Sequence, residues 1–252
     1  MVIHEYGNPE KPKIVLLAPM MVSGEDLVRI MSPHLKGEYF IIAPDQGGHG
    51  SAGDYIGADD EYAQLKLYLL KRGITKIALA YGASLGVAVA YRLFMDCDFD
   101  VDRAWFDGVA LCRNAVFAEW FAKRLFHQRK RALEKKPVEA SGSLAKMYGF
   151  DFAKMMTRNF ARISLEDIDA ICYACCHYDL KPLPDEQQSK LHLDYGSRDF
   201  DLWYSRRAIR RYMPKAELVV RKGYTHCGYM AAHEKEYVRE MEAFIQEGHK
   251  EK

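Results

Sequence analysis

The sequence predicts an α/β protein with three layers, in which helices cover both faces of a mostly parallel sheet. Short apolar runs typical of buried strands recur in the first hundred residues, and stretches with helical spacing of apolar residues separate them. This alternation stops between residues 114 and 181, where only helical patterns occur, and it resumes towards the end of the chain. We therefore expect one sheet whose strands are interrupted by a helical insertion.

The individual elements follow from the same patterns. Ser23 stands three residues before Asp26 and predicts a capping box at the start of a helix. Further helices are predicted over 61–71, 85–94, 202–212 and 233–246. The predicted strands are 13–18, 39–43, 76–80, 104–111, 190–195 and 217–220.

The helical stretch is expected to form a lid. It predicts helices over 115–135, over 143–162 with a break at Gly149, and over 165–176. The domain organisation expected from this pattern is a core formed by residues 1–113 and 182–252, with a lid over 114–181.

Composition excludes several classes of protein. An apolar content of 49% in 252 residues is enough for a large core and argues against disorder. With 36 basic and 35 acidic residues, the chain lacks the overall charge of a nucleic-acid-binding protein. No apolar run is long enough to span a membrane, and the N-terminus lacks the pattern of a signal peptide. Six scattered cysteines suit reduced thiols, so we expect a cytoplasmic protein.

The strongest chemical signal is the turn around Ser84. Gly82 and Gly86 flank this serine in a G-x-S-x-G pattern, which lies between a predicted strand and a predicted helix. The glycines would allow a sharp turn that exposes the serine hydroxyl, and the N–H of Leu85 would point towards an oxyanion on the substrate. The alternative is a glycine-rich turn with a structural role only.

With this motif in its strand–turn–helix context, the chain resembles proteins of the α/β-hydrolase fold over nearly its whole length. Residues 45–50, Asp-Gln-Gly-Gly-His-Gly, resemble the Asp-x-Pro-Gly-His-Gly loop of that family, with Gly47 in place of proline. The resemblance implies that His49 has a structural role in this loop rather than a catalytic one.

The family order of nucleophile, acid and histidine implies the remaining catalytic residues. His226, His233 and His249 all follow the last predicted strand. His226 lies in the loop directly after that strand, where the family places its base, whereas His233 belongs to the final helix and His249 to the charged tail.

The acid should follow the strand 190–195. Asp199 ends a Gly-Ser-Arg-Asp turn that fits the family pattern, and it is the expected acid. Asp194, within the strand, and Asp201, a possible cap of the next helix, are the alternatives.

The resemblance also implies a second oxyanion donor in the loop after the first core strand. Alignment on that strand makes the N–H of Met20 the expected donor. We expect Met21, Phe121 and Met155 to line the substrate pocket. The alternative for Met20 and Met21 is simple packing in the core.

Two other clusters have more ordinary explanations. Residues 172–177 contain a C-x-x-C pattern and a histidine, but no second ligand pair accompanies them, so we expect buried thiols and no metal. The helix predicted over 115–135 is strongly basic around Lys123, Arg124 and 129–131. This pattern suits contact with an anionic membrane or substrate, or a solvated helix face.

We therefore expect a serine hydrolase that cleaves an ester-like bond in a small, partly apolar substrate through an acyl-enzyme. Such a mechanism requires no cofactor and no metal. The alternatives are hydrolysis of a thioester, amide, lactone or carbon–carbon bond by the same residues, or a non-catalytic ligand-binding protein of the same fold. The expected partner is a small molecule and not a nucleic acid.

Overall fold

The computed structural model describes residues 1–250, except for the side chains of 137, 138, 140, 249 and 250. Its centre is a seven-stranded sheet with the order β1-β3-β2-β5-β7-β8-β9. Every neighbouring pair is parallel except β1 with β3. The strands are β1 (Val2–Tyr6), β2 (Lys13–Leu17), β3 (Phe40–Asp45), β5 (Leu79–Ala83), β7 (Ala104–Asp107), β8 (Leu191–Gly196) and β9 (Glu217–Arg221). A separate pair joins β4 (Lys76–Ile77) to β6 (Asp100–Val101).

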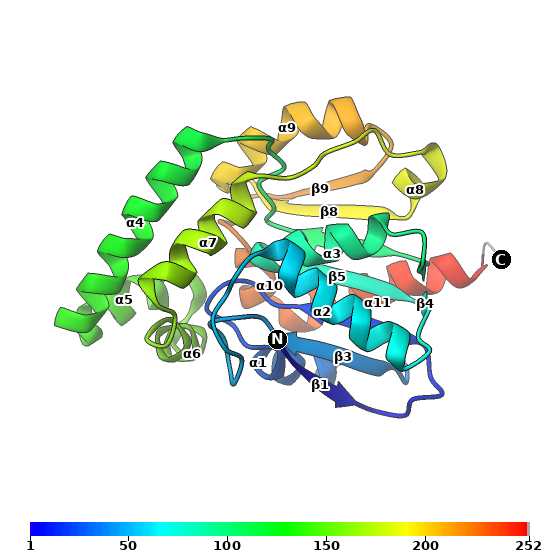
Figure 1. The fold of residues 1–252 in the computed structure, drawn as a ribbon, viewed down its shortest axis with the longest axis horizontal. Coiled ribbons are helices and arrows are strands. Elements are labelled where there is room, and N and C mark those ends of the chain that lie inside the picture. Colours follow the sequence, from blue (N-terminus) through cyan, green and yellow to red (C-terminus); the bar gives the residue numbers. More distant parts are fainter. Residues whose placement is uncertain (251–252) are drawn as a thin grey trace.

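Helices cover both faces of this sheet, which confirms the predicted three-layer α/β fold (Figure 1). Apolar side chains of α2 (Ala58–Lys71), α3 (Leu85–Met95) and α9 (Phe200–Tyr212) belong to one buried cluster. Those of α1 (Gly24–Met31) and α11 (Glu234–Lys250) belong to a second cluster. The short elements are η1 (Ser32–His34), α8 (Asp185–Ser189) and α10 (Gly228–Ala232).

The helical insertion between β7 and β8 consists of α4 (Val116–Lys135), α5 (Pro137–Tyr148), α6 (Phe150–Phe160) and α7 (Leu165–Cys176), and the short α8 follows it before β8. Helices α4 to α7 lie beyond the carboxyl ends of the parallel strands (Figure 1). Backbone hydrogen bonds connect the two ends of this insertion. The N–H of Ala115 donates to the carbonyl oxygen of Cys176 at 3.1 Å, and the N–H of Tyr178 donates to that of Cys112 at 3.0 Å.

Several boundaries differ from those that the sequence predicts. Strand β1 was not predicted, because an edge strand that is only partly buried lacks a continuous apolar run. The run 104–111 stops being a strand at Asp107, because Gly108 turns the chain with φ +60°. The helix predicted from residue 143 begins at Pro137, a residue that suits the first turn of a helix. The predicted break at Gly149 and the cap at Ser23 are both present.

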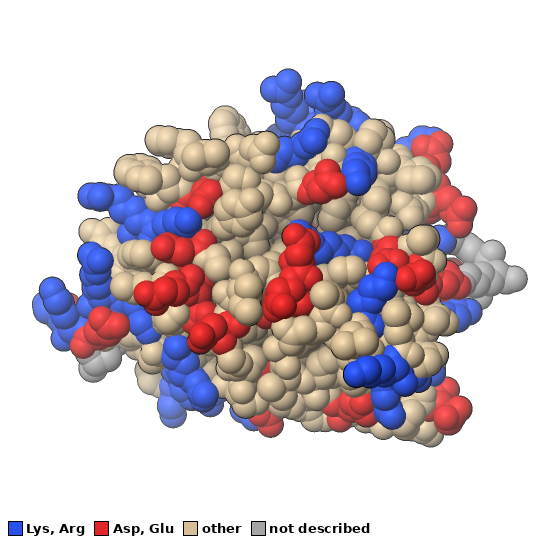
Figure 2. Space-filling model, in the orientation of Figure 1, with Lys and Arg blue, Asp and Glu red and all other residues tan. Residues whose placement is uncertain are grey.

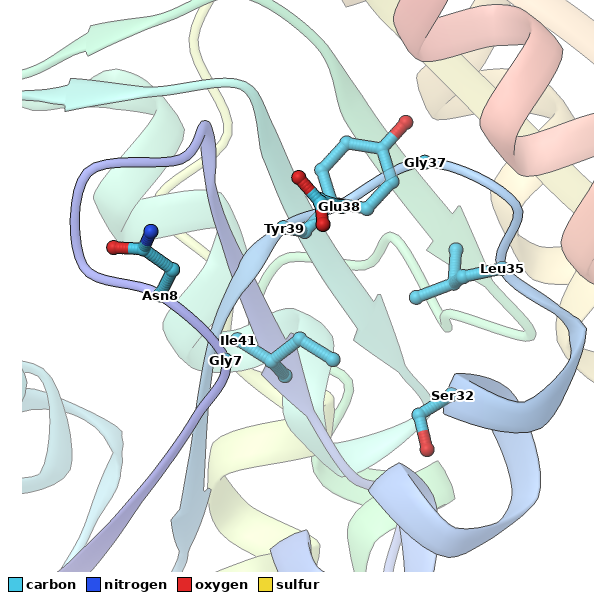
Figure 3. Close-up of a pocket in the computed structure, with 8 residues that line it drawn as sticks. All are labelled: Gly7, Asn8, Ser32, Leu35, Gly37, Glu38, Tyr39 and Ile41. Carbon is cyan, nitrogen blue, oxygen red and sulfur yellow. The ribbon is translucent and has the colours of Figure 1, made fainter.

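One hollow lies away from the carboxyl edge of the sheet. A cavity of about 240 Å³ lies where β1 ends and β3 begins, which is the amino edge of the parallel strands (Figure 3). It is lined by Gly7, Asn8, Ser32, Leu35, Gly37, Glu38, Tyr39 and Ile41. Among the described residues, no helix combines the length and the apolar character that crossing a bilayer requires.

Candidate active site at the carboxyl edge of the sheet

Ser84 occupies a strained turn between β5 and α3. Its backbone has φ +49° and ψ −113°, a conformation that residues other than glycine rarely adopt. The N–H of Ser84 donates to the carbonyl oxygen of Asp107 at 2.8 Å, which fixes the turn against the end of β7. Ser84 is partly exposed, unlike the residues on either side of it.

The two glycines of the motif allow the close packing that this turn requires. A Cβ atom at Gly86 would lie 2.1 Å from the carbonyl oxygen of Leu17 in β2, and one at Gly82 would lie 2.8 Å from the Cβ of Ala90. Any larger residue would therefore push α3 away from the sheet.

Asp199 and His226 form a hydrogen-bonded pair. Oδ2 of Asp199 lies 3.1 Å from Nδ1 of His226, and Oδ1 accepts from the N–H of Asp201 at 3.0 Å as a cap of α9. In the neutral imidazole of such a pair Nδ1 carries the proton, and Nε2 of His226 then has a lone pair that can accept a proton. Asp199 is buried and its carboxylate makes two hydrogen bonds, so it holds the imidazole in one orientation.

His226 and Ser84 both contact the residues that end β7. A Cβ atom at Gly108 would lie 2.9 Å from Cε1 of His226 and 2.9 Å from Sγ of Cys227. The N–H of Ser84 is hydrogen-bonded to Asp107, the residue before Gly108. The serine and the imidazole therefore flank the same turn at Gly108. The structure thus brings Ser84, Asp199 and His226 to one place at the carboxyl edge of the sheet.

A second carboxylate approaches the same imidazole. Oδ2 of Asp201 lies 3.4 Å from Nδ1 of His226, and burial raises the pKa of Asp201 to about 6. Burial alone would lower the pKa of His226, but its pKa lies well above the usual range because Cys227 and Asp199 both favour the charged form. Burial also raises the pKa of Cys227 to about 12, so this thiol is uncharged at neutral pH. We therefore attribute the raised pKa of His226 to Asp199.

The loop after β2 is fixed through Met21. This residue has φ +73°, and its N–H donates to Nε2 of His49 at 3.0 Å. Its carbonyl oxygen accepts from Nδ2 of Asn159 in α6 at 3.0 Å. Since the N–H of Met21 is engaged, that of Met20 is the better candidate for an oxyanion donor in this loop. Leu85, the expected first donor, is the first residue of α3.

His49 lies in the loop after β3 and holds the loop after β2 in place. Its Nδ1 lies 2.9 Å from the carbonyl oxygen of Gly47, so Nδ1 carries the proton and Nε2 accepts from Met21. Burial lowers the pKa of His49, which keeps the ring neutral. Both ring nitrogens are engaged by backbone groups, as a structural role requires.

Solved structures share the overall arrangement over nearly the whole chain. The chain is 17% identical to a carboxylesterase from Nitrososphaera gargenis, with a TM-score of 0.74 and coverage of 100% of this chain and 96% of the other. It is 14% identical to MenH from S. aureus, with a TM-score of 0.75 and coverage of 98% of both chains. The chain has the α/β-hydrolase fold.

A third similar solved structure is that of a bromoperoxidase from Bacillus anthracis. It is 17% identical, with a TM-score of 0.73 and coverage of 97% of this chain and 94% of the other. No protein-family model matches the sequence, and no curated protein shows significant sequence similarity to it. At these identities the solved structures establish the fold alone.

Within this α/β-hydrolase fold, the predicted pocket residues occupy different environments. The side chain of Met21 is buried in the core cluster below α2 and α3. Met155 in α6 is partly buried against the second cluster, whereas Phe121 in α4 is 54% exposed. Sequence reasoning missed Tyr148, whose hydroxyl donates to the carbonyl oxygen of His226 at 3.1 Å.

Two of the other candidates for the acid and the base, Asp194 and His233, are hydrogen-bonded to residues other than Ser84 and His226. Asp194 accepts from Nε and Nη2 of Arg221 at 2.8 and 2.6 Å. Nε2 of His233 lies 2.5 Å from the hydroxyl of Tyr224. The side chain of His249 lies outside the described residues.

Asp107 adds an unusual buried carboxyl group beneath the site. The hydroxyl of Tyr237 donates to its Oδ2 at 3.0 Å. Burial and the nearby charge of Asp194 raise the pKa of Asp107 to about 7. The floor of the site is therefore only partly charged near neutral pH.

Potential metal ligands occur in two groups among the described residues. One comprises Asp199, Asp201 and His226, and the other comprises Asp96, Cys97 and Asp98. Lys66 lies 2.6 Å from both Asp96 and Asp98 and offsets part of the negative charge of the second group. In the cysteine-rich stretch, Cys172 and Cys176 are buried, and Nε2 of His177 lies 2.8 Å from Glu119.

Proposed function

We propose that the chain is a serine hydrolase that cleaves an ester-like bond with Ser84, His226 and Asp199. The observation that carries this proposal is the hydrogen bond between Asp199 and His226, whose imidazole lies beside the turn at Gly108 that Ser84 also flanks. A purely structural loop has no need for an oriented imidazole beside a strained serine.

In this mechanism Oγ of Ser84 attacks the carbonyl carbon while Nε2 of His226 accepts the hydroxyl proton. The N–H groups of Met20 and Leu85 stabilise the oxyanion of the tetrahedral intermediate. The imidazolium then protonates the leaving alcohol, and an acyl-serine ester remains. Water, deprotonated by His226, attacks this ester and releases the acid and Ser84. No cofactor takes part in these steps.

The substrate is proposed to be small and partly apolar, with Met21, Met155 and Phe121 as pocket residues. Residues 114–181 act as the lid in this proposal, because α4 to α7 lie beyond the carboxyl edge that carries Ser84 (Figure 1). Names such as carboxylesterase among proteins of the same fold support ester chemistry as the first choice. Free thiols at all six cysteines support a reducing compartment such as the cytoplasm.

A fluorophosphonate probe tests the proposal directly, because it reacts only with an activated serine. Ser84→Ala should abolish labelling and reduce the hydrolysis of a p-nitrophenyl ester by about 10⁴–10⁶-fold. Ser51→Ala is the matched control, since Ser51 contacts Asp45 through its backbone N–H and should label normally. Labelling that persists in Ser84→Ala would contradict the assignment. Failure of the wild-type protein to label would favour a non-catalytic binding protein.

A further inference from the structure

Two helices of this protein begin with exposed aromatic side chains in the same pattern. Aromatic residues recur at positions i, i+3 and i+4 at the start of α4 and at the start of α9, so each set lies on one helix face. Five of these side chains are more than half exposed. We call them the aromatic face: Phe117, Trp120, Phe121, Phe200 and Trp203.

Four of the five rings of the aromatic face form two pairs, and none of the five is buried in the core. The ring centroids of Phe117 and Trp120 lie 5.9 Å apart, and those of Phe200 and Trp203 lie 6.1 Å apart. Phe117 is 75% exposed and Trp203 is 69% exposed. Such a concentration of exposed aromatic surface is typical of a binding surface.

The two halves of the aromatic face belong to neighbouring parts of the molecule. The N–H of Leu111, in the segment that leads into α4, donates to Oγ of Ser205 in α9 at 2.9 Å. The first turns of α4 and α9 lie next to each other in Figure 1. Figure 2 shows an uncharged area over them, with basic side chains on α9 above it and on α4 below it.

Basic residues are concentrated in the same two segments. Residues 113–136 contain eight basic and two acidic residues, and residues 198–211 contain five basic and two acidic residues. These segments therefore carry nine net positive charges, whereas the whole chain carries only +1. The remaining residues must carry eight net negative charges, so the small overall charge conceals a strong local asymmetry.

We propose that the aromatic face binds the anionic surface of a phospholipid membrane. Aromatic rings partition favourably into the headgroup region, and lysine and arginine side chains are attracted to anionic lipids. Neither contact requires a membrane-spanning helix. A second copy of this chain is a poorer occupant, because pairing two such faces would bring like charges together.

The binding does not depend on catalysis. Phe200 directly follows Asp199, so docking brings the candidate active site to the lipid surface. The variant Ser84→Ala should nevertheless bind vesicles as tightly as the wild type. Failure of the hydrolase proposal and failure of the membrane proposal are therefore distinguishable.

Tryptophan fluorescence provides the first measurement. Trp120 and Trp203 belong to the aromatic face, whereas Trp105 is 1% exposed and serves as an internal reference. We expect a blue-shifted emission and cosedimentation with vesicles of phosphatidylcholine containing about one third phosphatidylglycerol, but not with pure phosphatidylcholine. Raising NaCl from about 0.1 to 0.5 M should release most of the protein.

Variants separate the aromatic and the charged contributions. Phe117→Ser with Trp203→Ser, and separately Arg206→Glu with Arg210→Glu, should each weaken binding to the anionic vesicles at least about tenfold. Leu67→Ser, a 54% exposed position on α2, and Lys76→Glu on β4 are matched controls that should bind within about twofold of the wild type. Circular dichroism and the melting temperature verify that each variant is folded.

Three results would overturn the proposal. They are absence of binding to anionic vesicles, equal losses in the control variants, and tighter binding to a single-stranded oligonucleotide than to vesicles. A concentration-dependent dimer that buries Trp120 and Trp203 without lipid would also overturn it and would assign the aromatic face to self-association.

Discussion

Nδ2 of Asn159 donates a hydrogen bond of 3.0 Å to the carbonyl oxygen of Met21 and so connects helix α6 to the loop after β2. His49 binds the N–H of the same residue. Met21 is thus held at φ +73° by one contact from the core and one from the insertion. In the proposed mechanism this conformation orients the N–H of Met20, the residue before it.

Asn159→Ala should therefore lower kcat about tenfold with little change in KM. The reason is that loss of a buried hydrogen bond, worth about 1–3 kcal/mol, loosens the loop that carries the oxyanion donor, and this donor stabilises the transition state more than the bound substrate. Steady-state kinetics with a p-nitrophenyl ester measure both constants. Arg158→Ala is the control, because Arg158 binds Asp26 and not Met21. Equal effects of the two substitutions on kcat would show that only the attachment of α6 matters.

The two carboxylates near His226 should differ in importance. Asp199→Asn should reduce kcat about 10⁴-fold, because an amide favours the wrong tautomer of the imidazole. Asp201→Asn should cost far less, since Asp201 is the more distant of the two, at 3.4 Å against 3.1 Å. Measurement of kcat in both variants decides the assignment. A larger loss in Asp201→Asn would identify Asp201 as the acid.

Asp107 should make stability depend on pH. Its pKa of about 7 in the folded protein lies above the value of an exposed carboxyl, so its protonated form contributes stability at low pH. This contribution is complete below about pH 4 and is lost as the pH rises through 7, at about 1.4 kcal/mol for each unit between the two pKa values.

Asp107→Asn should remove this decline, because an amide stays neutral and its oxygen still accepts from Tyr237. The urea midpoint should fall less between pH 5 and pH 8 in the variant than in the wild type. Asp151→Asn, at an exposed position on α6, should leave the wild-type decline unchanged. Parallel pH curves for the wild type and Asp107→Asn would refute the raised pKa.

Substitutions in the insertion should redistribute activity among substrates. Met155→Ala and Phe121→Ala remove apolar surface from α6 and α4 and leave Ser84, Asp199 and His226 in place. We expect the ratio of kcat/KM for a short and a long acyl ester to change several-fold, since apolar contacts discriminate by about 1–3 kcal/mol per methylene group. Ratios that remain at the wild-type value would place the pocket elsewhere.

The fold and the residues at the strand ends could be predicted because they depend on local patterns. Buried parallel strands produce continuous apolar runs, and the turn at Ser84 requires glycines that are visible in the sequence. The order of Ser84, Asp199 and His226 along the chain then follows from the resemblance to the α/β-hydrolase fold. The structure places these three residues at one edge.

Contacts between distant segments could not be predicted in this way. Asn159 and Tyr148 lie in the insertion, and no periodicity indicates that their polar groups bind the carbonyl oxygens of Met21 and His226. The approach of Asp201 to His226 depends on how Asp199 caps α9, a detail of one turn. The edge strand β1 was not predicted, because its residues are exposed or only partly buried and form no continuous apolar run.

The hydrogen bonds that join the two ends of the insertion have a consequence for how this protein can change. Backbone hydrogen bonds join Ala115 to Cys176 and Tyr178 to Cys112, so the end of the insertion lies beside its start. Strands β7 and β8 pair directly through Ala104 and Leu191, whatever the length of the connection between them. Because closing a longer loop costs little additional entropy, we expect the segment from α4 to α7 to be exchangeable. Chimaeras that receive this segment from another protein of the same fold should retain the sheet and acquire a different surface.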